Sequence, residues 1–204
     1  MLTFAVLVFG GCNKSEEPVE DWVDLGLPSG LLWATHNVGA AMPEEYGDYF
    51  AWGETQPKND YENVTYKYIV YLPQEPYGGY GPYYLTKYCN DDWYGYGGYV
   101  DQLNVLLPSD DAATVNLGDG ARIPTKEEWE ELCQNTKSEW TTQRGVRGRC
   151  FIGQNGNKLF LPECGFRYSN HDVYVGHNGY YWSRSLYLSS PVIAWALFFD
   201  SDGA

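Results

Sequence analysis

The stretch His-Asp-Val-Tyr-Val-Gly-His, residues 171–177, holds three side chains of the kinds that bind metal ions: His171, Asp172 and His177. A zinc site takes three or four such ligands in a fixed tetrahedral arrangement. The stretch is expected to be a loop, and no third histidine lies near it, since the remaining one is His36. We therefore expect no metal site and no cofactor.

Covalent catalysis would need a serine or cysteine nucleophile beside a histidine. None of the three histidines lies in a nucleophile-elbow or comparable context. The acids Glu127, Glu128, Glu130 and Glu131 could serve acid–base catalysis, but they fill the polar positions of a predicted helix. A solvated helix face is the simpler interpretation, so the sequence indicates a protein that is not an enzyme.

The N-terminal segment Met-Leu-Thr-Phe-Ala-Val-Leu-Val-Phe-Gly-Gly-Cys predicts export. Its apolar run is too short to span a bilayer and is typical of a signal peptide, residues 1–11. Its end resembles a bacterial lipobox, which predicts lipidation of Cys12 and a lipid-anchored place in the outer membrane. The alternative is a buried or an exported soluble N-terminus. Residues 12–21 are polar and acidic and read as a flexible tether, similar to the surface-export signal of Bacteroides-type lipoproteins.

Four further cysteines would lie in a disulfide-permissive compartment: Cys89, Cys133, Cys150 and Cys164. A hairpin that turns at Asn155-Gly156 sets Cys150 opposite Leu161, so Cys164 lies too far along the strand to pair with Cys150. The other pairings stay open. The spacings match no zinc-binding pattern.

The composition bounds the partners and the fold class. The 204 residues carry a net charge of −14, which disfavours nucleic acid and anionic lipid as partners of the folded part. We therefore expect membrane contact only through the lipid anchor. Aromatic residues reach 17%, with 19 Tyr and 8 Trp beside 23 Gly, which favours a loop-rich, sheet-containing domain over a helical bundle.

The clearest local signal is the helix predicted in Pro-Thr-Lys-Glu-Glu-Trp-Glu-Glu-Leu-Cys. Thr125 and Glu128 have the spacing of a capping box. Trp129, Leu132 and Cys133 follow at i, i+3 and i+4 and form one apolar stripe that must face a core.

The other elements are predicted more coarsely. A hairpin is expected around Pro28-Ser29-Gly30, and one or two helical turns after Ser109 or Asp110 as N-cap. Residues 57–100, rich in Tyr and Gly, are expected to form a long loop over the core, with a disordered insertion as the alternative. After residue 136 we expect only strands and turns. Together these elements indicate one α+β domain, residues 22–204.

Five blocks in order resemble a known group: VDLGLPSGLLWATHNVGA, PEEYGDYFAWGET, DDAATVNLGDGARIPTKEEWEEL, NGNKLFLPECGFRY and GYYWSRSLY. They are similar to the fibrobacter-type major paralogous domain of exported Bacteroidetes lipoproteins. RIPTKEEWEEL and GFR are more distantly similar to the formylglycine-generating enzyme (sulfatase-modifying factor) group. The resemblance implies a C-type-lectin-like fold: a small twisted antiparallel sheet, two short helices and long loops.

The resemblance also implies two absences. Members continue beyond the Phe-Asp-Ser turn with a strand that closes the sheet, so we expect a domain truncated at its C-terminus, or else a variant that ends with an exposed edge. The formylglycine-generating enzyme uses two closely spaced cysteines near its C-terminus, and here no cysteine follows Cys164. This supports the expectation that the chain is not an enzyme.

The function expected is a surface-exposed binding module whose ligand is a glycan or a protein. The aromatic and polar C-terminal stretch suits recognition, and the candidate ligand-binding residues are Tyr174, Asn178, Tyr180, Arg184, Tyr187, Ser189 and Trp195. Related proteins include targets of diversity-generating retroelements, for which the candidates are Tyr187, Leu188, Ser189, Ser190, Val192 and Trp195. Core packing is the alternative for Tyr181, Trp182 and Phe199. The alternative function is a non-binding structural or decayed cell-envelope paralogue.

Overall fold

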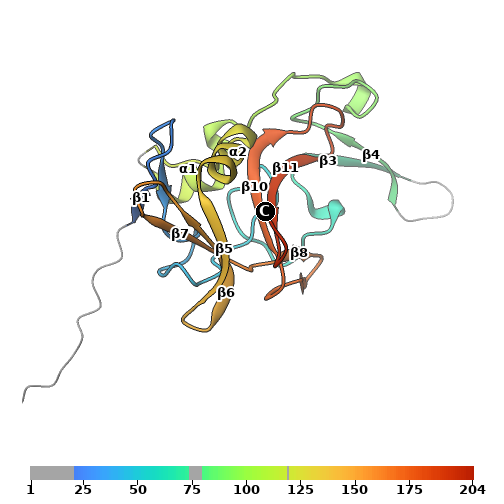
Figure 1. Cartoon of the computed structure of the whole chain (residues 1–204). Coiled ribbons are helices and arrows are strands. Elements are labelled where there is room, and N and C mark those ends of the chain that lie inside the picture. Colours follow the sequence, from blue (N-terminus) through green and yellow to red (C-terminus); the bar gives the residue numbers. More distant parts are fainter. Residues whose placement is uncertain (1–20, 74–79, 119) are drawn as a thin grey trace, which may run out of the picture.

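The computed structural model describes residues 21–73, 80–118 and 120–204 (Figure 1). Cys12, the expected signal peptide and nearly all of the tether lie outside the described residues, so lipidation and anchoring stay predictions. In the described part, no helix has the length and apolar character needed to cross a bilayer.

The described strands form five small antiparallel sheets beside two α-helices and three 3-10 helices. The sheets are β1 (Trp22–Asp24) with β2 (Leu32–Ala34), β3 (Ile69–Pro73) with β4 (Tyr80–Leu85), β5 (Lys137–Gln143) with β6 (Val146–Ile152) and β7 (Lys158–Pro162), β8 (Phe166–Tyr168) with β9 (His171–Val173), and β10 (Gly179–Leu186) with β11 (Ala194–Phe199). The α-helices are α1 (Ala112–Leu117) and α2 (Lys126–Asn135), and the 3-10 helices span Asn63–Thr65, Tyr96–Gly98 and Pro108–Asp110. The α+β class is therefore confirmed, but the strands are divided among separate small sheets instead of forming the one sheet expected.

The first hairpin forms around the predicted turn. Trp22 pairs with Ala34 and Asp24 with Leu32. The Gly30 amide donates to the Leu27 carbonyl at 2.9 Å, and Gly30 has φ of +70°, a conformation that glycine adopts without a steric penalty. The hairpin places Trp33 in the core beside the buried segment that follows β1.

Helix α2 begins with the predicted capping box. The Thr125 hydroxyl accepts from the Glu128 amide, and the Glu128 carboxylate accepts from the Thr125 amide. Trp129 and Leu132 are buried, and Cys133 packs against the same core, so the predicted apolar stripe is confirmed. The four glutamates were expected to line a solvated helix face, but two of them have specific partners. Glu128 also forms a bidentate ion pair with Arg122, and Glu131 accepts a hydrogen bond from the Ser29 amide at 2.8 Å.

Helix α1 corrects the predicted cap. Ser109 and Asp110 belong to the preceding 3-10 helix, and the N-cap is Asp111, whose side chain accepts from the Thr114 amide. Asp111 also accepts from the Ile123 amide, which ties the end of the following loop to the helix start. A carboxylate that satisfies amides on two segments outweighs the local preference for a serine cap.

The glycine- and tyrosine-rich region is more regular than a long loop. β3 and β4 form an antiparallel pair with Ile69 opposite Leu85 and Tyr71 opposite Tyr83. The prediction of a loop over residues 57–100 was therefore wrong for residues 69–73 and 80–85. The β-branched and aromatic residues of these strands favour a pleated surface, and the Tyr71 and Tyr83 rings lie 5.7 Å apart across the pair.

The β6–β7 hairpin has a register one residue away from the predicted one. Cys150 pairs with Phe160, and Leu161 pairs with Arg149. Ile152 opposite Lys158 leaves residues 153–157 as a five-residue connection, so the turn is longer than a two-residue turn at Asn155-Gly156. Cys164 is still beyond reach of Cys150, and all four cysteines of the described part are free thiols.

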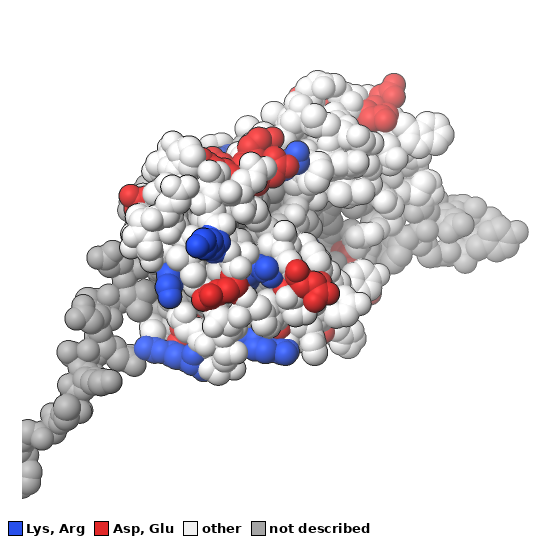
Figure 2. Space-filling model, viewed as in Figure 1, with Lys and Arg blue, Asp and Glu red and all other residues white. Residues whose placement is uncertain are grey.

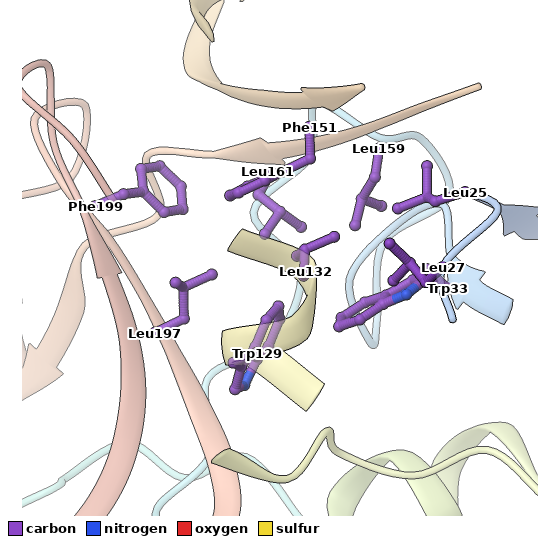
Figure 3. Close-up of a cluster of buried hydrophobic side chains, with 10 residues drawn as sticks. All are labelled: Leu25, Leu27, Trp33, Trp129, Leu132, Phe151, Leu159, Leu161, Leu197 and Phe199. Carbon is purple, nitrogen blue, oxygen red and sulfur yellow. The ribbon is translucent and has the colours of Figure 1, made fainter. Parts of the chain in front are cut away.

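The main core joins elements that are distant in the chain (Figure 3). Its buried members are Leu25, Leu27, Trp33, Trp129, Leu132, Phe151, Leu159, Leu161, Leu197 and Phe199. Trp33 and Trp129 lie 5.1 Å apart between ring centroids. Leu197 and Phe199 bring β11 into this core, so the C-terminal hairpin is held against α2 and the β6–β7 pair. A second cluster of Trp52, Tyr68, Tyr88, Leu106 and Leu186 supports the other end of β10.

Candidate functional site

The β10–β11 hairpin carries most of the predicted ligand-binding residues. Gly179 pairs with Phe199, Trp182 with Ala196 and Leu186 with Ala194. The connecting loop, residues 187–193, is closed by its own backbone bonds: the Tyr187 amide donates to Ile193, the Ser190 amide to Tyr187 and the Ile193 amide to Ser190, at 2.9–3.1 Å. The loop conformation therefore depends little on its side chains.

This loop meets the segment 90–102, and we call the two together the tip surface. The Asn90 side-chain amide donates to the Leu188 carbonyl at 2.9 Å and links them. Between them lies a hollow of about 430 Å³. Its lining consists of Asn90, Asp91, Asp92, Val100, Gln102, Leu188, Ser189 and Pro191. The predicted site residue Ser189 thus lines a cavity whose other wall comes from a different part of the chain.

The hollow is polar, and the segment 90–102 on one side of it carries three exposed aromatic side chains. Its polar groups are two carboxylates, two amides and a hydroxyl, and the exposed rings in segment 90–102 are Trp93, Tyr96 and Tyr99. Trp93 is 80% exposed, and its backbone amide donates to the Asp91 carboxylate at 2.9 Å. A side chain at Gly95 would lie 1.8 Å from the Tyr99 carbonyl oxygen, so glycine is required for the chain to fold back closely here.

Tyr187 and Trp195 lie together beside the loop. Their rings meet edge to face with centroids 5.1 Å apart, and the Lys126 ammonium lies 4.7 Å from the Trp195 ring centroid. The pair extends the aromatic surface of the loop onto β11. Tyr187 and Trp195 are therefore in contact, and Ser189 belongs to the same loop as Tyr187.

Tyr174, Asn178 and Tyr180 lie at the opposite end of the hairpin. The Tyr180 ring packs between Phe166 and Phe198, with centroid distances of 5.1 and 5.0 Å, while Tyr174 is exposed. Tyr187 follows Tyr180 by seven positions, which corresponds to about 23 Å of extended chain at roughly 3.3 Å per residue. One small ligand therefore cannot contact both groups.

Arg184 lies between the two groups and points inward. Its guanidinium donates to the Leu106 carbonyl at 2.6 Å and lies 3.8 Å from the buried Asp111 carboxylate. These contacts join β10 to the N-terminus of α1. Arg184 positions the hairpin and is not available at the tip surface.

A second cavity of about 630 Å³ runs between the β1–β2 hairpin, the segment around Arg122 and the first half of β10. Its walls are mainly apolar, and their aromatic side chains include Trp22, Phe50, Tyr61, Trp129 and Trp182. Tyr180 is the one predicted ligand-binding residue that lines it. Arg122, a cation of its wall, is engaged by Glu128 through two bonds of 2.6 Å.

The described residues hold no cluster of three His, Cys, Asp or Glu side chains that could bind a metal ion. Asp172, one of the three candidate ligands, instead accepts from Arg167 at 2.6 Å. Burial raises the pKa of the Cys89, Cys133, Cys150 and Cys164 thiols. These thiols are therefore protonated at neutral pH and are not activated as nucleophiles.

Sequence reasoning missed one wall of the hollow. The sequence Cys-Asn-Asp-Asp-Trp, residues 89–93, carries the signal: neighbouring carboxylates and an amide followed directly by a tryptophan in a glycine-rich stretch. Nothing local indicated that this stretch would meet residues 188–191, because that contact joins segments about a hundred residues apart.

Comparison with known proteins adds no relative: no family model, no curated protein and no solved structure matches this chain.

Proposed function

We propose that the protein is a surface-exposed binding module that recognises a neutral glycan at the tip surface. The observation that carries the proposal is the polar hollow between Asp91, Asp92 and Ser189, in a surface that also exposes Trp93. The proposal narrows the expected ligand, a glycan or a protein, to one class.

Sugar rings present paired hydroxyl groups on their edges and C–H groups on their faces. Carboxylates accept hydrogen bonds from neighbouring hydroxyls, and side-chain amides both donate and accept. Aromatic rings offer apolar area for the C–H face at a small cost in conformational entropy. The hollow supplies the first set of groups, and Trp93, Tyr96 and Tyr99 supply the second.

The charge of the site favours an uncharged glycan. Asp91 and Asp92 lie in the lining of the hollow, and the whole chain has a net charge of −14. Acidic sugars and nucleic acid would be repelled by this field. An uncharged glycan is not repelled by this negative field when it binds.

The proposal includes the fold and location expected from the resemblance. Small antiparallel sheets with two α-helices are compatible with a C-type-lectin-like domain. Lipidation at Cys12 would hold this domain at the outer membrane, on the cell surface. A relation to the variable proteins of diversity-generating retroelements belongs to the same proposal, because its candidate positions from Tyr187 to Val192 lie in the loop of the tip surface.

The test is a glycan array followed by titration of the best neutral hit. We expect Trp93→Ala to weaken binding by about tenfold to a hundredfold, the size of one lost ring contact of about 1–3 kcal/mol. Asp92→Asn should weaken it as well, and Tyr83→Ala, an exposed aromatic on β4, should leave it unchanged.

Two results would overturn the proposal. If no glycan binds, or if a hit binds Trp93→Ala and wild type equally, the tip surface is not a glycan site. Failure to bind glycans and proteins alike would favour the alternative, a structural or decayed paralogue with no ligand.

A further inference from the structure

Strand β11 is an edge strand. On one side it pairs with β10, and among the residues that the structure describes no strand pairs with its other side. β10 differs, because the Arg184 amide donates to Pro124, and the Leu106 amide donates to the Arg184 carbonyl, at 2.9 and 3.0 Å. Of the two strands of this hairpin, β11 is therefore the one that presents a row of backbone groups outward in the described part of the chain.

The edge of β11 lacks the usual features that protect sheet edges. From Ala194 to Phe199 it has no charged residue and no proline, and the register irregularity of the hairpin adds its extra residues to β10. Trp195 and Phe198 are 36% and 42% exposed. Natural edge strands are normally blunted by lysine, proline or a bulge, since an open edge pairs with other chains. An unblunted edge indicates an interaction surface.

We propose that β11 pairs with β11 of a second copy of this chain, in antiparallel orientation about a twofold axis. An uncharged strand is self-complementary in this arrangement, because no two like charges face each other across the pair. Asp200 follows the strand directly, and antiparallel pairing puts the two Asp200 side chains at opposite ends. Elsewhere the surface of a chain with net charge −14 repels its own copy.

Figure 2 shows the face of the molecule that carries the β10–β11 hairpin. Most of the face that carries the hairpin is uncharged, with the acidic and basic side chains in small separate groups. Phe198 lies between the buried Leu197 and Phe199, and Trp195 is exposed near the start of the strand. Pairing would cover the exposed side chains while the buried ones stay in the core.

The association is expected to be weak. A single six-residue strand pair covers less than a standard interface of about 1,600 Å², so we expect a dissociation constant on the order of 100 µM. A dimer of this kind forms when the chain is concentrated.

The test compares two lysine variants by analytical ultracentrifugation between about 10 and 500 µM. Wild type should pass from monomer to dimer over this range, and Ala196→Lys should stay monomeric. Ala41→Lys is the matched control, because it makes the same change at an exposed alanine in a loop and should dimerise like wild type.

Hydrogen exchange on wild type gives a readout that needs no variant. The amides of β11 should exchange more slowly at high concentration, while those of the exposed β5 strand should not change. Wild type that stays monomeric at 500 µM, or equal dimerisation of Ala196→Lys and Ala41→Lys, would overturn the proposal. A dimer whose β11 amides show no added protection would overturn it too.

Discussion

Replacing Trp129 by alanine should remove a large share of the stability of the domain. Trp129 is 8% exposed and is the first residue of the apolar stripe of α2. Its ring contacts Trp33 and Tyr181, with centroid distances of 5.1 and 6.3 Å, and its indole N–H donates to the Trp182 carbonyl at 3.2 Å. One side chain therefore links the N-terminal hairpin, α2 and β10.

The expected loss follows from two contributions. An indole buries about 200 Å² of apolar surface, which corresponds to about 5 kcal/mol at about 25 cal/mol per Å². Measured truncations of buried Trp cost about 3–5 kcal/mol, and the unpaired carbonyl of Trp182 adds about 1 kcal/mol. We expect about 4–6 kcal/mol, against a total of about 5–15 kcal/mol for natural domains.

Urea unfolding followed by circular dichroism measures this loss. With a slope of about 2 kcal/mol per molar urea, the midpoint should fall by about 2–3 M. Trp129→Phe keeps most of the ring and should lose only about 1–2 kcal/mol. Trp93→Ala is the matched control, since Trp93 is exposed, and should change stability by less than about 0.5 kcal/mol. If Trp129→Ala unfolds within about 1 kcal/mol of wild type, the role assigned to this side chain is wrong.

Three further predictions concern charged and capping groups. Burial opposes ionisation of Asp110, but hydrogen bonds from Lys87 and Tyr88 outweigh this effect and hold the pKa of Asp110 at about 2. The ionised carboxylate therefore stabilises the folded state. In thermal melts, the stability advantage of wild type over Asp110→Asn should be full above about pH 4 and should vanish as the pH falls toward 2. Burial raises the pKa of Glu163 and outweighs the effect of the nearby Arg147, so ionisation of Glu163 destabilises the folded state. The stability of Glu163→Gln relative to wild type should therefore increase as the pH rises above about 4.5. A stability difference that stays constant across pH would contradict this prediction. Thr125→Ala should cost about 0.5–2 kcal/mol through loss of the helix cap, and Thr125→Ser should restore most of it.

The features that the sequence predicted well are those with local causes. The capping box at Thr125 and the stripe led by Trp129 need only neighbouring residues, and both are confirmed. The turn at Gly30 likewise follows from the conformation of a few residues. These elements also contribute much of the main core.

The features that were missed depend on distant contacts. Asp111 replaced the expected cap because Ile123, twelve residues on, needs its carboxylate. The tip surface needed segment 90–102 to meet the loop after β10. Arg184 was taken for a ligand-binding residue, and its interior contacts with Leu106 and Asp111 could not be read from its surroundings in the sequence.

The loop after β10 also has a consequence for how the protein could change over time. Its backbone closes through bonds between Tyr187, Ser190 and Ile193 that involve no side chain. Leu188, Ser189 and Val192 are exposed, so their side chains can be replaced without disturbing either core. The molecule thus separates a tolerant display segment from a fixed scaffold, and a library randomised at these positions should yield folded variants with altered binding preferences.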